Sequence, residues 1–292
     1  MTTEQGGPRL RPALPAAALA LALVIGLAAL ATPPTSGGYQ ARVTNSTNTA
    51  GTAPYFTCHG AMAADKAAAI FAYRLAEPSG SAVAADFSGK NNPGTYRGTM
   101  SSDTTSANRP CTPRDAGGSY ALTGTSTYVS AGGPIARAST NTFTLEVWFR
   151  TTTPGGRLIG WGNTATGTST TYDRHIFMNN AGQLVFGVYP GTVKVITTPG
   201  SYNDGAPHHV AATLSPAGMK LYVDGQLAAQ DPATTTGETF SGFWRIGYNN
   251  LAGWGPNEPS NHAFTCRMRY AAAYSTALTP AQIAAHHTAG RP

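Results

Sequence analysis

The sequence predicts an all-β protein: a two-sheet antiparallel β-sandwich of the jelly-roll type, with a short C-terminal helix and an N-terminal leader helix. Several segments after about residue 120 alternate apolar and polar side chains with a period of two, as strands do. Turn residues separate these segments at short intervals. Only 11% of the residues are charged, while 34 are Gly and 21 are Pro, a composition typical of short strands joined by turns.

Residues 1–38 are expected to be a signal peptide or an N-terminal membrane anchor. Arg9 and Arg11 precede an apolar run over residues 13–31, and Ala29-Leu30-Ala31 resembles a small-residue cleavage site. The run is longer than the usual h-region of about 7–15 residues and approaches the roughly 18 residues of a membrane span. Cleavage and retention both stay open, and both predict an exported protein, extracellular or at the cell surface, that meets the membrane only through this segment.

Residues 39–69 are predicted to hold an extended segment and then a short Ala-rich helix. The three cysteines, Cys58, Cys111 and Cys266, suit an oxidising compartment, and no CxxC spacing suggests a zinc or redox site. Because Cys58 and Cys111 both flank the start of the folded region, we predict a disulfide between them, with Cys266 unpaired. The alternative is three buried thiols.

The segment FTLEVWFRT (143–151) is the clearest strand. Its alternation places four apolar residues on one face, Phe143, Leu145, Val147 and Phe149, and a mixed set on the other face, Thr144, Glu146, Trp148 and Arg150. The first face is expected to lie in the core. In FWRIG, Trp244 alternates with Ile246 and is expected in the core as well.

The segment HHVAATLSPAGMKLYVDGQLAA (208–229) is predicted to be scaffold. Asp224-Gly225 is typical of a two-residue hairpin turn, in which both residues take positive φ. His208 and His209 point to opposite faces of a strand, so we expect packing or capping roles for them rather than joint metal binding. The C-terminal helix is expected to start after the cap Thr279, with Pro280 first, and to stop at Gly290.

Residues 70–292 resemble the laminin-G-like, concanavalin A-like lectin/glucanase jelly-roll domains of bacterial secreted proteins. The resemblance lies in an ordered series of segments: AYRLAEPSGSAVAADFSGKNNPGTYRG, YALTGTSTYVSAG, FTLEVWFRT, HHVAATLSPAGMKLYVDGQLAA, FWRIGYNN and YSTALTPAQIAAHHTAG. It implies two face-to-face antiparallel sheets, one of them concave. It also implies a noncatalytic binding module for glycans or proteins, in a family that often holds calcium at a sheet edge.

Calcium is therefore a candidate ligand, although no cofactor is required. Asp86, Ser88 and Asn91 in DFSGKNN would supply part of a calcium shell, and the alternative is an Asx turn. The late strand of the family usually carries an acidic residue after a glycine. In this chain Cys266 takes the glycine position, with Arg267 and Arg269 nearby, which weakens the calcium hypothesis.

Catalysis is not expected, because no paired-carboxylate or triad motif occurs. Glycosidases need two carboxyl groups across the scissile bond. Glu146 is followed on its own face by Trp148 and Arg150, and the sequence holds neither a Glu-x-Asp-x-x-Glu nor a G-x-S-x-G motif. A partner carboxylate on another strand, such as Asp173, keeps a glycoside hydrolase as a minor alternative.

The predicted function is carbohydrate binding at the concave sheet or its edge loops. Aromatic rings with flanking polar groups are the usual form of a sugar site, and the candidate residues are Glu146, Trp148, Arg150, Trp161, Tyr248 and Trp254. In the alternative interpretation, Trp148 packs beneath a loop and Glu146 pairs with Arg150. A structural cell-surface or matrix protein is the second functional hypothesis.

The net charge of +6 comes without a Lys/Arg run, so nucleic acid is not an expected partner. The oligomeric state stays undetermined.

Overall fold

The computed structural model describes residues 43–44, 49–50, 55–111, 114–124 and 127–291. The chain divides into two compact units, Met1–Gly51 and Thr52–Pro292. The described part of the first unit is an antiparallel pair of short strands, β1 (Val43–Thr44) and β2 (Thr49–Ala50). The predicted leader, residues 1–38, lies outside the described residues. Within the described residues, no helix has the length and apolar character needed to span a membrane.

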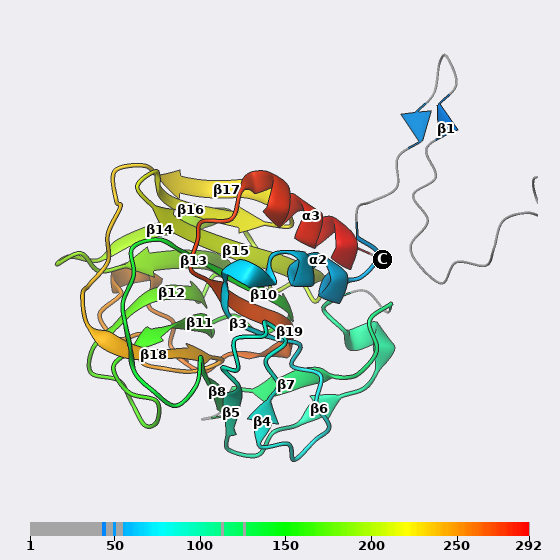
Figure 1. The fold of residues 1–292 in the computed structure, drawn as a ribbon. Coiled ribbons are helices and arrows are strands. Elements are labelled where there is room, and N and C mark those ends of the chain that lie inside the picture. Colours follow the sequence, from blue (N-terminus) through cyan, green and yellow to red (C-terminus); the bar gives the residue numbers. More distant parts are fainter. Residues whose placement is uncertain (1–42, 45–48, 51–54, 112–113, 125–126, 292) are drawn as a thin grey trace, which may run out of the picture. The chain divides into compact units, whose positions relative to one another are not determined.

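The second unit is a sandwich of two antiparallel sheets, as predicted (Figure 1). The described strands of the eight-stranded sheet are, in spatial order, β17 (Gln226–Asp231), β16 (Gly218–Val223), β15 (Pro207–Ser215), β10 (Phe143–Arg150), β19 (Thr265–Tyr274), β7 (Ser119–Thr123) and β6 (Ser102–Asp103), with β3 (Ala69–Tyr73) also paired to β19. The described strands of the nine-stranded sheet are β14 (Lys194–Ser201), β13 (Gln183–Val188), β12 (Tyr172–Met178), β11 (Gly156–Gly162), β18 (Ser241–Ile246), β8 (Tyr128–Ala131), β5 (Gly94–Arg97) and β4 (Val83–Ala84), with β9 (Arg137–Ala138) paired to β18.

The core lies between the sheets and follows the period-two pattern. The four apolar residues of β10 are fully buried, and Phe143 contacts Phe186 and Trp244 of the other sheet at centroid distances of 6.1 and 5.9 Å. Burying each such side chain contributes about 1.5–3 kcal/mol. The turn between β16 and β17 also agrees with the sequence, because Asp224 and Gly225 both have positive φ, 51° and 77°.

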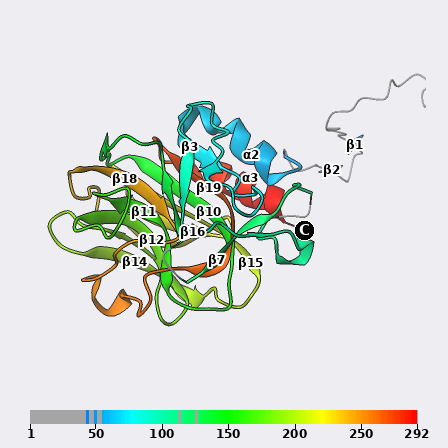
Figure 2. The same cartoon turned by 90° about the horizontal axis from the view of Figure 1, so that it is seen from below.

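Two helices cover the outer face of the eight-stranded sheet, α2 (Cys58–Ala64) and α3 (Pro280–Gly290) (Figures 1 and 2). Three short 3₁₀ helices complete the described elements: η1 (Lys66–Ala68), η2 (Ser106–Asn108) and η3 (Gly255–Asn257). Helix α3 begins as predicted, because the Thr279 side chain accepts a hydrogen bond from the backbone N–H of Gln282, and the Gln282 side-chain oxygen accepts one from the backbone N–H of Thr279.

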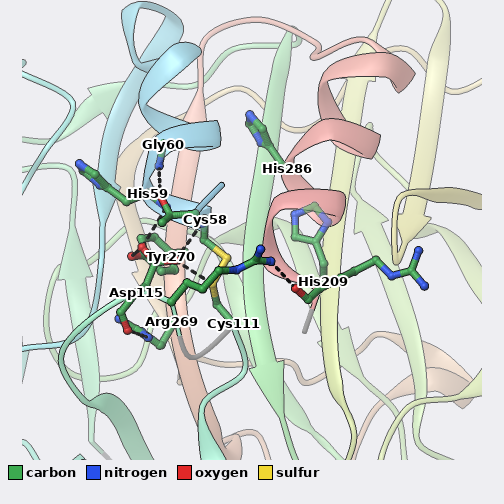
Figure 3. Close-up of a disulfide and its surroundings, with 12 residues drawn as sticks. Cys58, His59, Gly60, Cys111, Asp115, His209, Arg269, Tyr270 and His286 are labelled. Atoms are coloured by element: carbon green, nitrogen blue, oxygen red, sulfur yellow. Dashed lines mark hydrogen bonds between the residues drawn. A yellow bond between two sulfur atoms is a disulfide. The ribbon is translucent and has the colours of Figure 1, made fainter. Parts of the chain in front are cut away.

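The predicted disulfide between Cys58 and Cys111 is confirmed, and Cys266 is free and buried. Figure 3 shows this disulfide, which joins Cys58 at the start of α2 to Cys111. The Asp115 carboxylate accepts hydrogen bonds from the Cys58 backbone N–H (2.8 Å) and the Tyr270 hydroxyl (2.7 Å). Asp115 therefore joins the first turn of α2 to strand β19.

Candidate functional site

The prediction that Glu146 and Trp148 bind a ligand at an accessible surface is wrong, because α2 and α3 cover that face of β10. Glu146 is fully buried and Trp148 is 2% exposed. The Trp148 ring packs against the rings of His209 and His287, with centroids 4.9 and 5.8 Å away, and these two rings lie 6.2 Å from each other. The alternative interpretation is closer to the structure: Trp148 is packed beneath a covering segment, which is helix α3 rather than a loop.

Glu146 pairs with histidines rather than with Arg150. Its Oε1 lies 2.7 Å from Nε2 of His209 and 2.9 Å from Nδ1 of His286, whose Nε2 lies 2.9 Å from Oδ2 of Asp65. Burial by itself raises the pKa of Glu146, but the charge of His286 and the hydrogen bonds from both histidines hold it well below its usual range. Burial lowers the pKa of His286, and the two carboxylates outweigh it and raise that pKa to about 10.

This network ties α3 to the sheet and to the end of α2, and none of its members lines a described cavity. Sequence reasoning missed it. The only signals in the sequence were Glu146, a charged residue in a mostly apolar strand, and His286, which lies on a predicted helix that has to pack against the rest of the protein.

The two carboxylates considered for glycosidase chemistry are not a pair. Glu146 lies in β10 and Asp173 in β12, in different sheets. Asp173 is fully buried and forms an ion pair with Arg174, at 2.5 Å between Oδ2 and Nη1. The combination of Glu146 with Asp173 therefore gives no support to hydrolysis.

A cavity of about 340 Å³ lies on the nine-stranded sheet, and four chain segments contribute to it. We call it the tyrosine cavity. Its lining residues are Thr170, Thr171, Tyr172, Tyr189, Val193, Glu238, Ala252, Gly253 and Trp254. Tyr172, Tyr189 and Trp254 give this lining three aromatic residues, and Glu238 and the two threonines give it residues with polar side chains.

Buried Asp173 holds two walls of the tyrosine cavity in place. Its carboxylate accepts hydrogen bonds from the backbone N–H groups of Tyr189 (2.8 Å) and Glu238 (2.6 Å). Burial raises the pKa of Asp173, while the adjacent Arg174 charge and these N–H donors oppose the rise. Arg174 in turn donates to the Glu238 carbonyl (2.7 Å). The ion pair therefore fixes the position of loops that come from distant parts of the chain.

A glycine in β13 allows Trp254 to lie on the sheet. A Cβ at Gly187 would lie 2.3 Å from Cζ3 of Trp254, so a larger residue would displace the ring. The Trp254 ring meets His175 edge-on at 4.6 Å, and the Tyr172 hydroxyl donates to the Ala252 carbonyl (2.6 Å). Trp254 is only 3% exposed, whereas Tyr189 is 37% exposed. Tyr189 is therefore the ring most open to a ligand.

Of the residues predicted to bind a ligand, only Trp254 lines this cavity. Trp161 is 1% exposed and packs against Trp244 in the core at 4.8 Å, so its assignment to an open surface is wrong. Tyr248 is half-buried, with the Arg245 guanidinium 5.6 Å from its ring. Arg150 lines a different cavity. Tyr189 and Glu238 were missed, although an aromatic residue before the turn residues Pro190-Gly191 was a signal for the first.

The loop considered for calcium is arranged as an Asx turn. Asp86 Oδ1 accepts from the backbone N–H groups of Ser88 (2.9 Å) and Ala72 (3.0 Å), and its Oδ2 accepts from the Ser88 hydroxyl (2.8 Å) and the Asn92 N–H (2.9 Å). A calcium ion would compete with all four donors for these oxygens. The group as arranged does not fit calcium, and the calcium hypothesis has no geometric support from it.

Residues 123–284, more than half of the chain, match the family model of the concanavalin A-like lectin/glucanases superfamily. The chain belongs to this superfamily. No curated protein sequence matches this superfamily member.

Solved structures share the fold of this superfamily member at low sequence identity. The binding domain of Paraclostridial Mosquitocidal Protein 1 is 14% identical with a TM-score of 0.54, covering 76% of this chain and 52% of that one. Botulinum neurotoxin type C, which depends on interaction with two ganglioside molecules to enter cells, is 16% identical with a TM-score of 0.55, covering 79% and 53%. The binding domain of botulinum neurotoxin serotype D is 14% identical with a TM-score of 0.52, covering 78% of this chain and 52% of that one. This chain spans about half the length of these relatives.

Proposed function

We propose that this protein is an exported, noncatalytic module that binds a carbohydrate in the tyrosine cavity. The observation that carries the proposal is the meeting of Tyr189, Trp254 and Glu238 in one cavity, where Asp173 holds the backbone of Tyr189 and Glu238. Sugars present C–H faces that pack on aromatic rings and hydroxyls that bond to carboxylates and threonines.

The dimensions of the cavity favour a short part of a glycan. Its volume of about 340 Å³ is near the lower end of the range of about 300–1,000 Å³ for small-molecule sites. Burial and the nearby Asp173 charge raise the pKa of Glu238. A carboxylate whose charge is disfavoured in this way gains from hydrogen bonds donated by sugar hydroxyls.

The noncatalytic part of the proposal depends on the acids at the cavity. Among the described residues that line it, Glu238 is the single carboxylate, and the nearby Asp173 is bound to Arg174. Export is supported by the disulfide, because such bonds persist in oxidising compartments. The solved neighbours include binding domains, which is support by fold analogy.

The test is a glycan array followed by calorimetry on the full chain. We expect binding that falls about tenfold or more in Tyr189→Ala and is largely kept in Tyr189→Phe, which retains the ring. Phe56→Ala, which removes an exposed ring elsewhere, is the matched control and should bind as the parent does. An array without any bound glycan, or full binding by Tyr189→Ala, would contradict the proposal. Self-association of a chain that binds no glycan would favour the structural alternative.

A further inference from the structure

A second cavity lies where strands β10 and β19 run side by side and Arg150 ends its strand. We call it the arginine cavity. Its volume is about 260 Å³, and the residues used below are Arg150, Thr152 and Arg267. We propose that it binds one oxyanion, a carboxylate, sulfate or phosphate group carried on a small molecule or a sugar.

Two arginines face each other across the strands. In the β10–β19 register, Arg150 lies directly opposite Arg267, and residues opposite each other in an antiparallel pair point to the same face. Both are half-buried and both line the cavity. Like charges in this position destabilise a sheet unless an anion lies between or beside them.

The described residues supply one carboxylate for these two charges. Asp103 accepts a hydrogen bond from Nε of Arg267 at 2.6 Å. The Arg150 guanidinium donates to the neutral backbone carbonyl of Ala107, and no ion pair of Arg150 occurs among the described residues. One positive charge at this cavity is therefore left for a ligand to neutralise.

The remaining lining suits an anion. Among the described residues that line the cavity none is an Asp or Glu, since Asp103 reaches Arg267 from outside the lining set, and the exposed Thr152 adds a hydroxyl donor. A guanidinium presents parallel N–H donors that match two oxygens of a carboxylate, sulfate or phosphate. The arginine cavity shares no lining residue with the tyrosine cavity, so this inference does not depend on the proposed function.

The test uses the full chain with sodium sulfate, sodium phosphate and sodium glucuronate, each at constant ionic strength, and with glucose as the neutral probe. We expect calorimetry to detect binding of at least one anion, no binding of glucose at this cavity, and a rise of Tm with the bound anion. Arg150→Gln should weaken that binding about tenfold or more and abolish the rise. Tighter binding of glucuronate than of sulfate or phosphate would identify a carboxylated sugar as the ligand class. The reverse order of affinities would identify a sulfated or phosphorylated molecule.

The matched control is Lys194→Gln, which removes one exposed positive charge from β14. It should bind the anion as the parent does. In buffer without oxyanions, Arg150→Gln should keep or raise the Tm, because it removes one of two like charges placed opposite each other in the β10–β19 register. A Tm that is kept or raised separates lost binding from lost folding. Absence of binding by all three anions, an equal loss in Lys194→Gln, or an equal rise of Tm in Arg150→Gln would overturn the proposal.

Discussion

Nδ1 of His286 lies 2.9 Å from Oε1 of Glu146, so the last helix is joined to the central strand β10 through a buried pair whose members are 140 positions apart. Both side chains are fully buried. Removing one member of a buried ion pair leaves the other charge without compensation, which is more costly than the pair itself is stabilising. The pair therefore makes the packing of α3 sensitive to single substitutions.

We predict that His286→Ala lowers the free energy of unfolding by about 3–5 kcal/mol. The reason is that buried Glu146 loses its charged partner and keeps the His209 contact, while Asp65 loses His286 as well. Urea denaturation followed by circular dichroism measures the loss. His287→Ala, a change at the neighbouring position whose ring is 3.9 Å from Asp224, should cost clearly less. Equal losses in the two variants would refute a special role for the pair.

The same pair predicts how stability depends on pH. The pKa of His286 is raised from its ordinary value of 6.5 to about 10, so its contribution is complete below 6.5 and is lost as the pH rises through 10. The pKa of Glu146 is lowered from 4.5, so its contribution is present above 4.5 and is lost at lower pH. Melting curves of the parent and His286→Gln should differ most between about pH 4.5 and 6.5 and converge towards pH 10. A constant difference across this range would contradict the assignment.

Loss of the disulfide should weaken the whole sandwich unit. The bridge joins residues 53 positions apart, and removing such a bridge typically costs about 2–5 kcal/mol. We expect this loss in the double variant Cys58→Ala with Cys111→Ala, measured by chemical denaturation. Cys266→Ala, which removes the free buried thiol, is the control and should lose about 1 kcal/mol. A double variant no weaker than this control would show that the bridge contributes little.

Gly187→Ala should disturb the tyrosine cavity. The added methyl group would lie 2.3 Å from the Trp254 ring, so the ring must move, and overpacking of this kind costs about 1–3 kcal/mol. We expect altered tryptophan fluorescence and weaker glycan binding. Gly200→Ala is the control, because a Cβ at Gly200 meets no atom within 4 Å. Unchanged fluorescence in Gly187→Ala would mean that the loop adapts without moving the ring.

Asp86 is expected to stabilise the fold without calcium. Asp86→Ala would leave three buried or half-buried backbone donors and the Ser88 hydroxyl without their acceptor, with a cost of about 1–3 kcal/mol. Addition of calcium to the parent should neither release heat in calorimetry nor raise the Tm. A clear rise of Tm with calcium that disappears in Asp86→Ala would restore the calcium hypothesis.

The sequence was sufficient for features that depend on neighbours along the chain. The alternation in residues 143–151 predicted which face of β10 enters the core, and the residues around Thr279 and Asp224 predicted the start of α3 and a hairpin turn. These predictions succeeded because side-chain direction in a strand, capping and turn conformation are set within a few residues.

The sequence did not predict which segments cover a surface or which distant residues meet there. Alternation showed that Trp148 faces away from the inner core, but it carries no information about α2 and α3, which bury that ring. Tyr189 and Glu238 form one cavity because Asp173 binds the backbone of both.

The sequence by itself therefore determined the sandwich class, the faces of its strands, the terminal helix and a residue pair suited to a disulfide. Only the tertiary structure decided that Glu146 is part of a buried ionic network and that separate chain segments meet at the tyrosine and arginine cavities. The physical reason is that burial and charge pairing at these places depend on contacts between segments far apart in the chain, which no local pattern encodes.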